Sequence, residues 1–220
     1  MKSDHIPPVH ALLNFRIDAD IQFVSTAPEW VAGSIMSQPW AVVRREAAID
    51  NFLPIGIRGS SRSERCAARL STQDVLKVVL PTDLTRSALI GQICEQSNLP
   101  ALGALGAVSK IFSAHGLAPH WGPTGSVGFQ LACGMCVVHP GSDLDLVLMT
   151  ATPISRIVAI TLHRDLQQLP ARTDLLLETP LGGVALAEYV SSTGPWLIRT
   201  AQGPQMTRAP WPDGDVGRAA

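Results

Sequence analysis

The sequence has no excess of charge of one sign. It contains 17 lysine and arginine residues against 18 aspartate and glutamate residues, a formal net charge of −1 at pH 7. Sequence-independent binding to nucleic acid or to an anionic membrane surface depends on clustered positive charge. We therefore expect neither nucleic acid nor a membrane among the partners of this protein.

Targeting and membrane-spanning segments are missing as well. The N-terminus has no basic stretch followed by an apolar run, and no apolar run approaches the roughly 20 residues that cross a bilayer. We therefore expect a soluble, cytoplasmic protein. With 46% hydrophobic residues in 220, the chain is long enough for one large domain or two small ones with an ample core.

Cysteine is scarce, and the four cysteines are too few for a disulfide framework in a chain of this length. Cys133 and Cys136 form a C-x-x-C pattern with His139 three residues on, but a zinc knuckle needs a second ligand pair. We favour small side chains in a packed turn over a metal or redox site.

Several familiar catalytic motifs are absent too. The chain has no Ser-His-Asp order and no H-E-x-x-H, G-x-x-x-x-G-K-[ST] or G-x-G-x-x-G pattern. The six histidines are scattered and receive no role. Chemistry must therefore come from other side chains.

Two aspartates at the start of a predicted strand are the strongest candidates. The stretch 143–149 reads as a strand entered from the turn Pro140-Gly141. Successive side chains of a strand point to opposite faces, so Asp143 and Asp145 share one face and lie roughly 7 Å apart along the chain. Such a pair is typical of a Mg²⁺ site, because this ion takes carboxylate oxygens together with substrate phosphates. Two solvated acids are the plainer alternative.

A glycine-rich turn precedes this pair. In Gly122-Pro123-Thr124-Gly125-Ser126, glycine allows the backbone to approach a phosphate closely, and Ser126 adds a hydroxyl donor. Alone the pattern is only a turn. Followed by the aspartate pair, it predicts a phosphate cradle that faces a metal site.

A third carboxylate is expected from the next strand, predicted over 174–179. Asp174 and Glu178 share a face of that strand, and a third acid beside the aspartate pair is typical of two-metal phosphoryl transfer. Asp174 as a turn residue and Glu178 as a solvated strand end are equally good interpretations. The spacing does not decide between them.

Arginines gather after a predicted strand over 52–58. Arg58, Arg62 and Arg65 lie in a small polar loop, and Arg69 follows one turn on if Ser63 starts a helix. Arginine suits polyphosphate because its planar fork makes bidentate contacts. A solvated basic helix face is the alternative.

The order of expected elements indicates an α+β protein. We expect a short helix over 9–15, strands over 40–45, 52–58 and 75–80, and two helices, one around 84–94 and one from Pro100 to Gly116. Further on we expect helices over 153–168 and 183–191, a strand over 196–199, and a frayed tail from Pro204. The corresponding domains are an N-terminal α+β substrate-binding region (1–82), a helical connection (83–118), a catalytic domain (119–205) and a flexible tail (206–220).

Gly125-Ser126 followed by Asp143-Leu144-Asp145 resembles the signature of the polymerase-β-like nucleotidyltransferases. Further blocks are similar to the phosphoribosyl-dephospho-CoA transferases of malonate decarboxylase, which act as its holo-acyl-carrier-protein synthases. They are 53–59 with Arg62 and Arg65, 121–129, 141–146, 178–183 and 199–204. The resemblance implies a polymerase-β-like domain, a mixed sheet with flanking helices, preceded by a smaller α+β domain.

The same resemblance implies a reaction. The enzyme would take triphosphoribosyl-dephospho-CoA and attach phosphoribosyl-dephospho-CoA to a serine of the apo acyl carrier protein subunit of malonate decarboxylase, with release of pyrophosphate. It implies catalytic roles and Mg²⁺ binding for Asp143 and Asp145. Asp174 or Glu178, from the strand spacing above, is expected as a further ligand. Substrate binding falls to Gly125, Ser126 and Ser142, and to the arginines at 58, 62 and 65.

Other readings stay open. One is a related nucleotidyltransferase that acts on the carrier of citrate lyase or on a small molecule. Another is a non-catalytic member that binds a nucleotide or a partner; the intact Asp143 and Asp145 pair argues against it.

Overall fold

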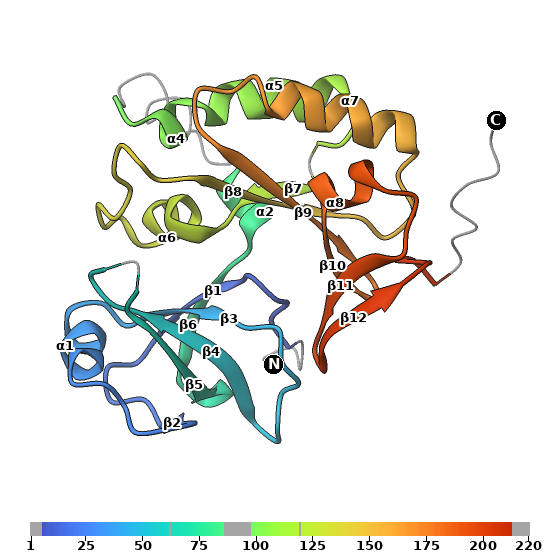
Figure 1. Ribbon diagram of the computed structural model, residues 1–220. Helices are drawn as coiled ribbons and strands as arrows, with labels where there is room; N and C mark the ends of the chain where they lie inside the picture. Colours follow the sequence, from blue (N-terminus) through green and yellow to red (C-terminus); the bar gives the residue numbers. More distant parts are fainter. Residues whose placement is uncertain (1–5, 62, 86–97, 119, 213–220) are drawn as a thin grey trace. The chain divides into compact units, whose positions relative to one another are not determined.

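The computed structural model describes residues 6–61, 63–85, 98–118 and 120–212 (Figure 1). The chain divides into two compact units, residues 1–80 and residues 81–220, and each has its own hydrophobic core. The predicted α+β class is confirmed, because each unit combines a six-stranded sheet with helices. Among the described residues, no helix is long and apolar enough to cross a bilayer.

The first unit is built on an antiparallel sheet with the strand order β2-β5-β4-β3-β1-β6. Its elements are β1 (Leu12–Phe15), β2 (Ile21–Phe23), α1 (Trp30–Ser37), β3 (Trp40–Val43), β4 (Phe52–Arg58), β5 (Arg65–Ser71), a 3-10 turn (Thr72–Asp74) and β6 (Val75–Val79). Val31 of α1 packs into the core that the sheet provides. The predicted hairpin of β3 and β4 is confirmed, with Val43 opposite Ile55.

Two helices predicted in this unit are strands. The segment expected as a helix over 9–15 holds β1, because His10 has a φ of +71°, which breaks a helix, and because β1 pairs with both β3 and β6. The helix considered from Ser63 does not form either, because β5 begins at Arg65. Cys66, Ala68 and Leu70 alternate into the core with the period of a strand. Arg65 and Arg69 therefore share the opposite face.

The second unit is built on a mixed sheet with the strand order β12-β11-β10-β9-β8-β7. Strands β8 and β9 are parallel, and the other pairs are antiparallel. The strands are β7 (Trp121–Pro123), β8 (Leu144–Met149), β9 (Thr173–Thr179), β10 (Gly182–Ala185), β11 (Trp196–Thr200) and β12 (Gly203–Thr207). The helices are α2 (Pro81–Leu84), α4 (Pro100–Gly103), α5 (Leu105–Ala114), α6 (Gly125–Cys133), α7 (Arg156–Leu166) and α8 (Leu186–Ser191).

The two faces of this sheet differ. One, the core face, carries Leu144, Leu146 and Leu148 of β8, which pack with apolar residues of α5, α7 and α8. Figure 1 shows α5 and α7 side by side over the sheet. The other face carries Asp145, Val147 and Met149 of β8 and their partners on β9, which are Asp174, Leu176 and Glu178. It continues through Gly183 of β10, the partner of Glu178, to Arg199 of β11, the partner of Gly183. We call it the carboxylate face.

The helices α4 and α5 fall within the predicted connection 83–118. They belong to the second unit, where Leu105, Val108 and Phe112 are part of the core. Phe112 stacks on Trp121 with ring centroids 4.9 Å apart. The helix expected around 84–94 lies mostly outside the described residues, since 86–97 are not described.

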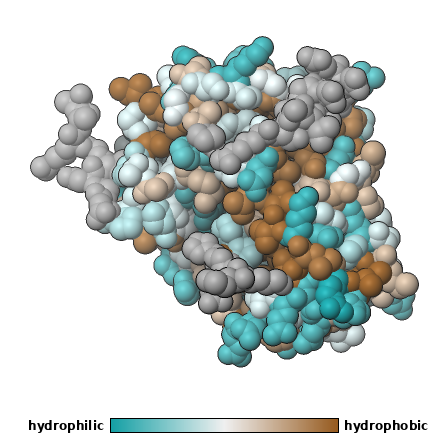
Figure 2. All heavy atoms as spheres, turned by 180° about the vertical axis from the view of Figure 1, so that it is seen from behind, coloured by the Kyte–Doolittle hydropathy of each residue, from teal (hydrophilic) through white to brown (hydrophobic). Residues whose placement is uncertain are grey.

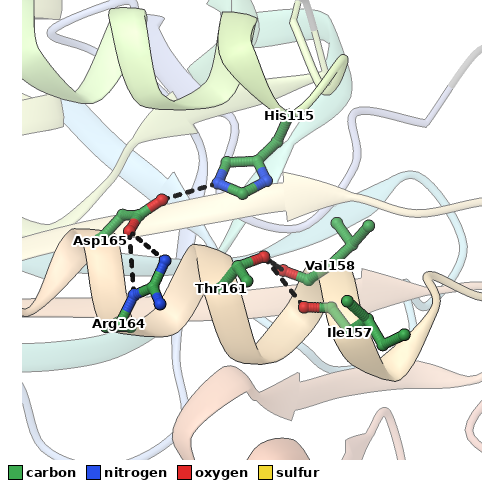
Figure 3. A network of polar contacts seen from close by, with 6 residues as sticks. All are labelled: His115, Ile157, Val158, Thr161, Arg164 and Asp165. Atoms are coloured by element: carbon green, nitrogen blue, oxygen red, sulfur yellow. Dashed lines mark hydrogen bonds and ion pairs between the residues drawn. The ribbon is translucent and has the colours of Figure 1, made fainter.

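A polar contact joins α5 to α7 (Figure 3). His115, directly after α5, has its Nε2 atom 2.9 Å from Oδ2 of Asp165 on α7. The hydrogen bond from His115, reinforced by Arg164, lowers the pKa of the Asp165 carboxyl below its usual value. Thr161, one turn earlier, donates to the carbonyl groups of Ile157 and Val158. The contact therefore fixes the exit from α5 against α7.

The C-terminal part of the second unit differs from expectation in two places. The helix expected over 183–191 is strand β10 followed by α8, because Gly182 has a φ of +145° and Val184 enters the core. The tail expected to fray from Pro204 instead forms β12, and Trp211 is 1% exposed. Its Nε1 atom donates to the carbonyl of Thr150 at 2.9 Å. The described part of this segment thus packs onto the unit.

Candidate active site

The two aspartates lie at the start of β8. Asp145 is the second residue of β8, and Asp143 is the residue directly before the strand. Both are half-buried. A compact turn fixes the entry: the Ser142 hydroxyl accepts a hydrogen bond from the His139 N–H at 3.0 Å. The Leu144 N–H then donates to the Arg172 carbonyl at 2.8 Å. The backbone on both sides of Asp143 is therefore held in place.

The N-terminus of α6 lies against Asp145. The Thr124 N–H donates to the backbone carbonyl of Asp145 at 2.8 Å. Gly125 follows with a φ of +57°, and a Cβ atom at this position would lie 2.0 Å from Oδ2 of Asp145. Only glycine fits here, both for its backbone conformation and for the space that the carboxylate occupies. The glycine turn and the aspartate strand, predicted as neighbours from the sequence, are in contact.

The first N–H groups of α6, beside Asp145, could bind an anion. The first turn of an α-helix leaves backbone donors without helical partners, and the helix dipole places positive potential there. Ser126, half-buried in this turn, adds a hydroxyl. A carboxylate can bind a cation, and a helix N-terminus attracts anions. Side by side, the two suit a ligand with a chain of phosphates, which can contact the cation and the helix N-terminus at once.

Gln130 is a residue that the sequence analysis missed. From α6 its Oε1 atom accepts hydrogen bonds from the N–H groups of Val137 and Val138, both at 2.9 Å. The loop from α6 to β8 is thereby tied to the same helix that touches Asp145. Gln130 is the only amide in a helix of small and apolar residues, which is the signal that the sequence offered.

The register of β8 and β9 separates the two candidates for a third carboxylate. Asp174 lies directly opposite Asp145, whereas Glu178 lies opposite Met149, four residues further along. At about 3.3 Å per residue, Glu178 is displaced by roughly 13 Å along the sheet from the Asp145 level. Asp174 is exposed and 3.5 Å from the guanidinium of Arg172. Asp174 and not Glu178 is therefore the neighbour of Asp145 on the carboxylate face.

Among the described residues, no group of three or more histidine, cysteine, aspartate or glutamate side chains is arranged to hold a metal ion. The oxygen donors of Asp143 and Asp145 still suit Mg²⁺. This ion commonly binds through one or two carboxylates and completes its shell with water and substrate phosphates. Of the C-x-x-C pattern, Cys133 ends α6 and Cys136 is an exposed free thiol, so the packed turn expected there is not found at Cys136.

The predicted arginine cluster belongs to the first unit. Arg58 ends β4 and Arg65 begins β5, and the two residues are directly paired across the hairpin. Between them, the Glu64 carboxylate accepts hydrogen bonds from the Ser61 N–H at 2.8 Å and the Ser60 hydroxyl at 2.9 Å, which lowers the pKa of Glu64. Arg62 lies outside the described residues. Arg69 is instead paired with Glu46.

Comparison with known proteins shows to which family this chain belongs. Residues 88–210 match the family model of the phosphoribosyl-dephospho-CoA transferase MdcG C-terminal domain, and residues 8–81 match that of its N-terminal domain. A phosphoribosyl-dephospho-CoA transferase of Pseudomonas putida is 40% identical over 84% of this chain and 86% of its own length. One from Azotobacter vinelandii is 36% identical over 94% and 95%, and one from Klebsiella pneumoniae 32% identical over 84% and 87%. No solved structure matches the chain.

These relatives define the protein as a transferase enzyme. The chain belongs to the phosphoribosyl-dephospho-CoA transferase family, as both of its halves and the full-length relatives show. The resemblance to the phosphoribosyl-dephospho-CoA transferases identified in the sequence is confirmed.

Proposed function

We propose that this enzyme transfers phosphoribosyl-dephospho-CoA from triphosphoribosyl-dephospho-CoA to a serine of the apo acyl carrier protein subunit of malonate decarboxylase. Pyrophosphate leaves. We further propose that the second unit is a polymerase-β-like nucleotidyltransferase domain. The observation that carries the proposal is the contact of Asp145 with the start of α6, where the carboxylate occupies the space of a side chain at Gly125.

The reaction breaks a phosphoanhydride bond and forms a phosphate ester bond. The carrier serine oxygen attacks the α-phosphorus of the donor and loses its proton, and the bond from that phosphorus to the diphosphate breaks. A phosphodiester then joins the ribose to the serine. In such in-line transfers the protein contributes chiefly positioning and charge stabilisation.

We assign each candidate residue a role in this reaction from its position. Asp143 and Asp145 would bind Mg²⁺, which when bound supplies positive charge for the phosphate oxygens. Gly125 and Ser126, at the start of α6, would bind the departing diphosphate with their N–H groups and the Ser126 hydroxyl. Ser142 holds the turn before Asp143 and would contribute to substrate binding through it. Arg58, Arg62 and Arg65 would bind further anionic groups of the donor.

For the third carboxylate we propose Asp174 over Glu178. Asp174 is paired with Asp145 across β8 and β9, while Glu178 belongs to a level four residues away. Its ion pair with Arg172 is exposed on both sides, so it offers little resistance to exchange for a metal ion.

The decisive experiment is mass spectrometry of the intact carrier protein. The purified enzyme is mixed with Mg²⁺, triphosphoribosyl-dephospho-CoA and the apo carrier subunit of malonate decarboxylase. We expect a mass gain equal to phosphoribosyl-dephospho-CoA that disappears with a chelator. Modification of the citrate lyase carrier alone, or transfer from ATP in place of the donor, would contradict the proposed substrates. Donor-dependent thermal stabilisation without pyrophosphate release would contradict catalysis.

Carboxylate variants test the site. Asp143→Asn and Asp145→Asn should each lower the transfer rate by at least about 100-fold with little change in the melting temperature, because these side chains are not core residues. Asp174→Asn should lower it far more than Glu178→Gln. An active Asp143→Asn enzyme, or the reverse order for the last two variants, would refute the respective assignment.

A further inference from the structure

Arg199 lies on the same face of the sheet as the catalytic candidates. Glu178 of β9 pairs with Gly183 of β10, and Gly183 pairs with Arg199 of β11. Directly paired residues project to the same side of a sheet. Since Glu178 and Asp174 alternate on one face of β9, Arg199 shares the carboxylate face with Asp145.

The guanidinium of Arg199 is available to a ligand. The residue is exposed, and within the described parts of the chain its side chain has neither an ion pair nor a hydrogen bond. Its neighbours on the strand, Trp196 and Ile198, are buried in the core, so the alternation of β11 turns Arg199 away from it. Gly183 places no side chain between Arg199 and Glu178. An exposed arginine beside a glycine leaves room for a phosphate group, and the planar guanidinium can donate to two of its oxygens at once.

Apolar side chains lie on this face between Arg199 and the aspartates. Leu176 occupies the level between Asp174 and Glu178 on β9 and is half-buried. Leu197, two residues before Arg199, is 38% exposed and pairs with Met206, which is 61% exposed. Figure 2 shows hydrophobic residues at the surface among hydrophilic ones, in the one view that it gives. Leu176 and Leu197 offer an apolar floor of the kind that flat aromatic bases cover.

The sheet geometry sets the separation. From β8 to β11 there are three strand spacings of about 4.8 Å, and from the Asp145 level to the Arg199 level four residues of about 3.3 Å. The two Cα atoms are thus on the order of 19 Å apart. The long arginine side chain can shorten this gap. In triphosphoribosyl-dephospho-CoA one ribose and one adenosine separate the transferable phosphate from the internal diphosphate.

We propose that Arg199 binds the internal diphosphate of the dephospho-CoA moiety, with the adenine over Leu176 and Leu197 and the transferable phosphate at Asp143 and Asp145. The inference rests on the proposed function for the identity of the donor. It makes the carboxylate face the donor-binding surface of the second unit, with Arg199 as the residue that selects a nucleotide carrying a 5′-diphosphate.

Binding of dephospho-CoA alone tests this without any transfer step. Isothermal titration calorimetry of the full-length protein, without Mg²⁺, compares wild type with Arg199→Gln and with Arg164→Gln, an exposed arginine of α7. We expect Arg199→Gln to weaken binding at least about tenfold, the loss of one charge-assisted contact, and Arg164→Gln to leave it unchanged. Binding of adenosine should be equally weak in all three proteins.

Kinetics give a second readout. If transfer occurs, the KM for the donor should rise at least about tenfold in Arg199→Gln, with kcat changed by less than about twofold and partial recovery in Arg199→Lys. Wild-type-like binding of dephospho-CoA by Arg199→Gln, an equal loss of adenosine binding, or no binding by the wild type would overturn the inference. If the carrier is not modified but these binding differences persist, the proposed acceptor is refuted, whereas the role of Arg199 in binding the donor is supported.

Discussion

At the scale of single residues, Gly125 is constrained both by its backbone and by its neighbour. Its φ of +57° is one that side-chain-bearing residues rarely adopt, and a Cβ atom would fall on the Asp145 carboxylate. We predict that Gly125→Ala abolishes most transfer activity, because Asp145 must move, and lowers the free energy of unfolding by about 1–3 kcal/mol. Carrier mass spectrometry and urea unfolding measure the two effects.

Gly116 supplies the matched control. It has a similar φ of +68°, but a Cβ atom there would meet no described residue within 4 Å. Gly116→Ala should therefore cost about 1 kcal/mol of stability from its backbone conformation alone and keep full activity. Equal loss of activity in both variants would show that general strain, and not the contact with Asp145, is responsible.

Gln130 allows a second residue-scale prediction. Its side chain accepts two N–H groups of the loop that leads to Asp143. Gln130→Leu leaves these donors without their acceptor, so we expect a loss of about 1–3 kcal/mol in stability and a fall in kcat. Gln130→Glu keeps the acceptor and should retain activity. A Gln130→Leu enzyme with wild-type kcat would show that the loop is held by other contacts.

At the scale of elements, Arg156 joins two helices. From the first turn of α7 it donates to the carbonyls of Tyr189, Val190 and Ser192 at 2.8–2.9 Å, at the C-terminal end of α8. The last carbonyls of a helix otherwise lack partners, and a guanidinium satisfies several at once. We predict that Arg156→Met lowers the free energy of unfolding by about 2–4 kcal/mol and that Arg156→Lys recovers part of it. Indistinguishable urea midpoints would contradict this.

The contact of α5 with α7 should depend on pH. Because His115 lowers the pKa of Asp165 in the folded state, the ionised carboxylate stabilises the fold above the unfolded value of about 3.9, and this contribution is lost as the pH falls through the folded pKa. His115→Gln should remove about 0.5–1 kcal/mol at pH 6, a modest value because Asp165 is 35% exposed, and progressively less as the pH falls below the unfolded pKa. Urea unfolding of both proteins across this pH range, with the titration of Asp165 followed by NMR, checks this prediction. A stability difference between wild type and variant that does not change with pH would contradict it.

At the scale of the whole molecule, two separate cores predict independent responses. Trp211 is buried in the core of the second unit and contacts Tyr189 edge-on with centroids 5.6 Å apart. Trp211→Ala should lower the stability of that unit by about 3–5 kcal/mol and leave amide-exchange protection in the first unit unchanged. Equal loss of protection in β3 and β4 would show that the units unfold together.

Features that depend on nearby residues could be predicted from the sequence. The strand ends at 52 and 58 were predicted as observed, since β-branched and apolar residues are bounded there by polar turns. The pairing of Gly125 with an aspartate strand followed from residue chemistry, as did the family. A turn that requires a positive φ leaves few alternatives to glycine at position 125.

Features that depend on distant partners could not be predicted in this way and follow from the packing of the folded chain. Short apolar runs suit a helix or a strand equally well, so β1, β5 and β10 took their form from the strands beside them. Trp211 is buried because Thr150 and Tyr189 receive it, which no local pattern near Pro204 encodes. The choice of Asp174 over Glu178 as neighbour of Asp145 is a matter of register between β8 and β9, and register is set by packing across the sheet and not by the spacing within one strand.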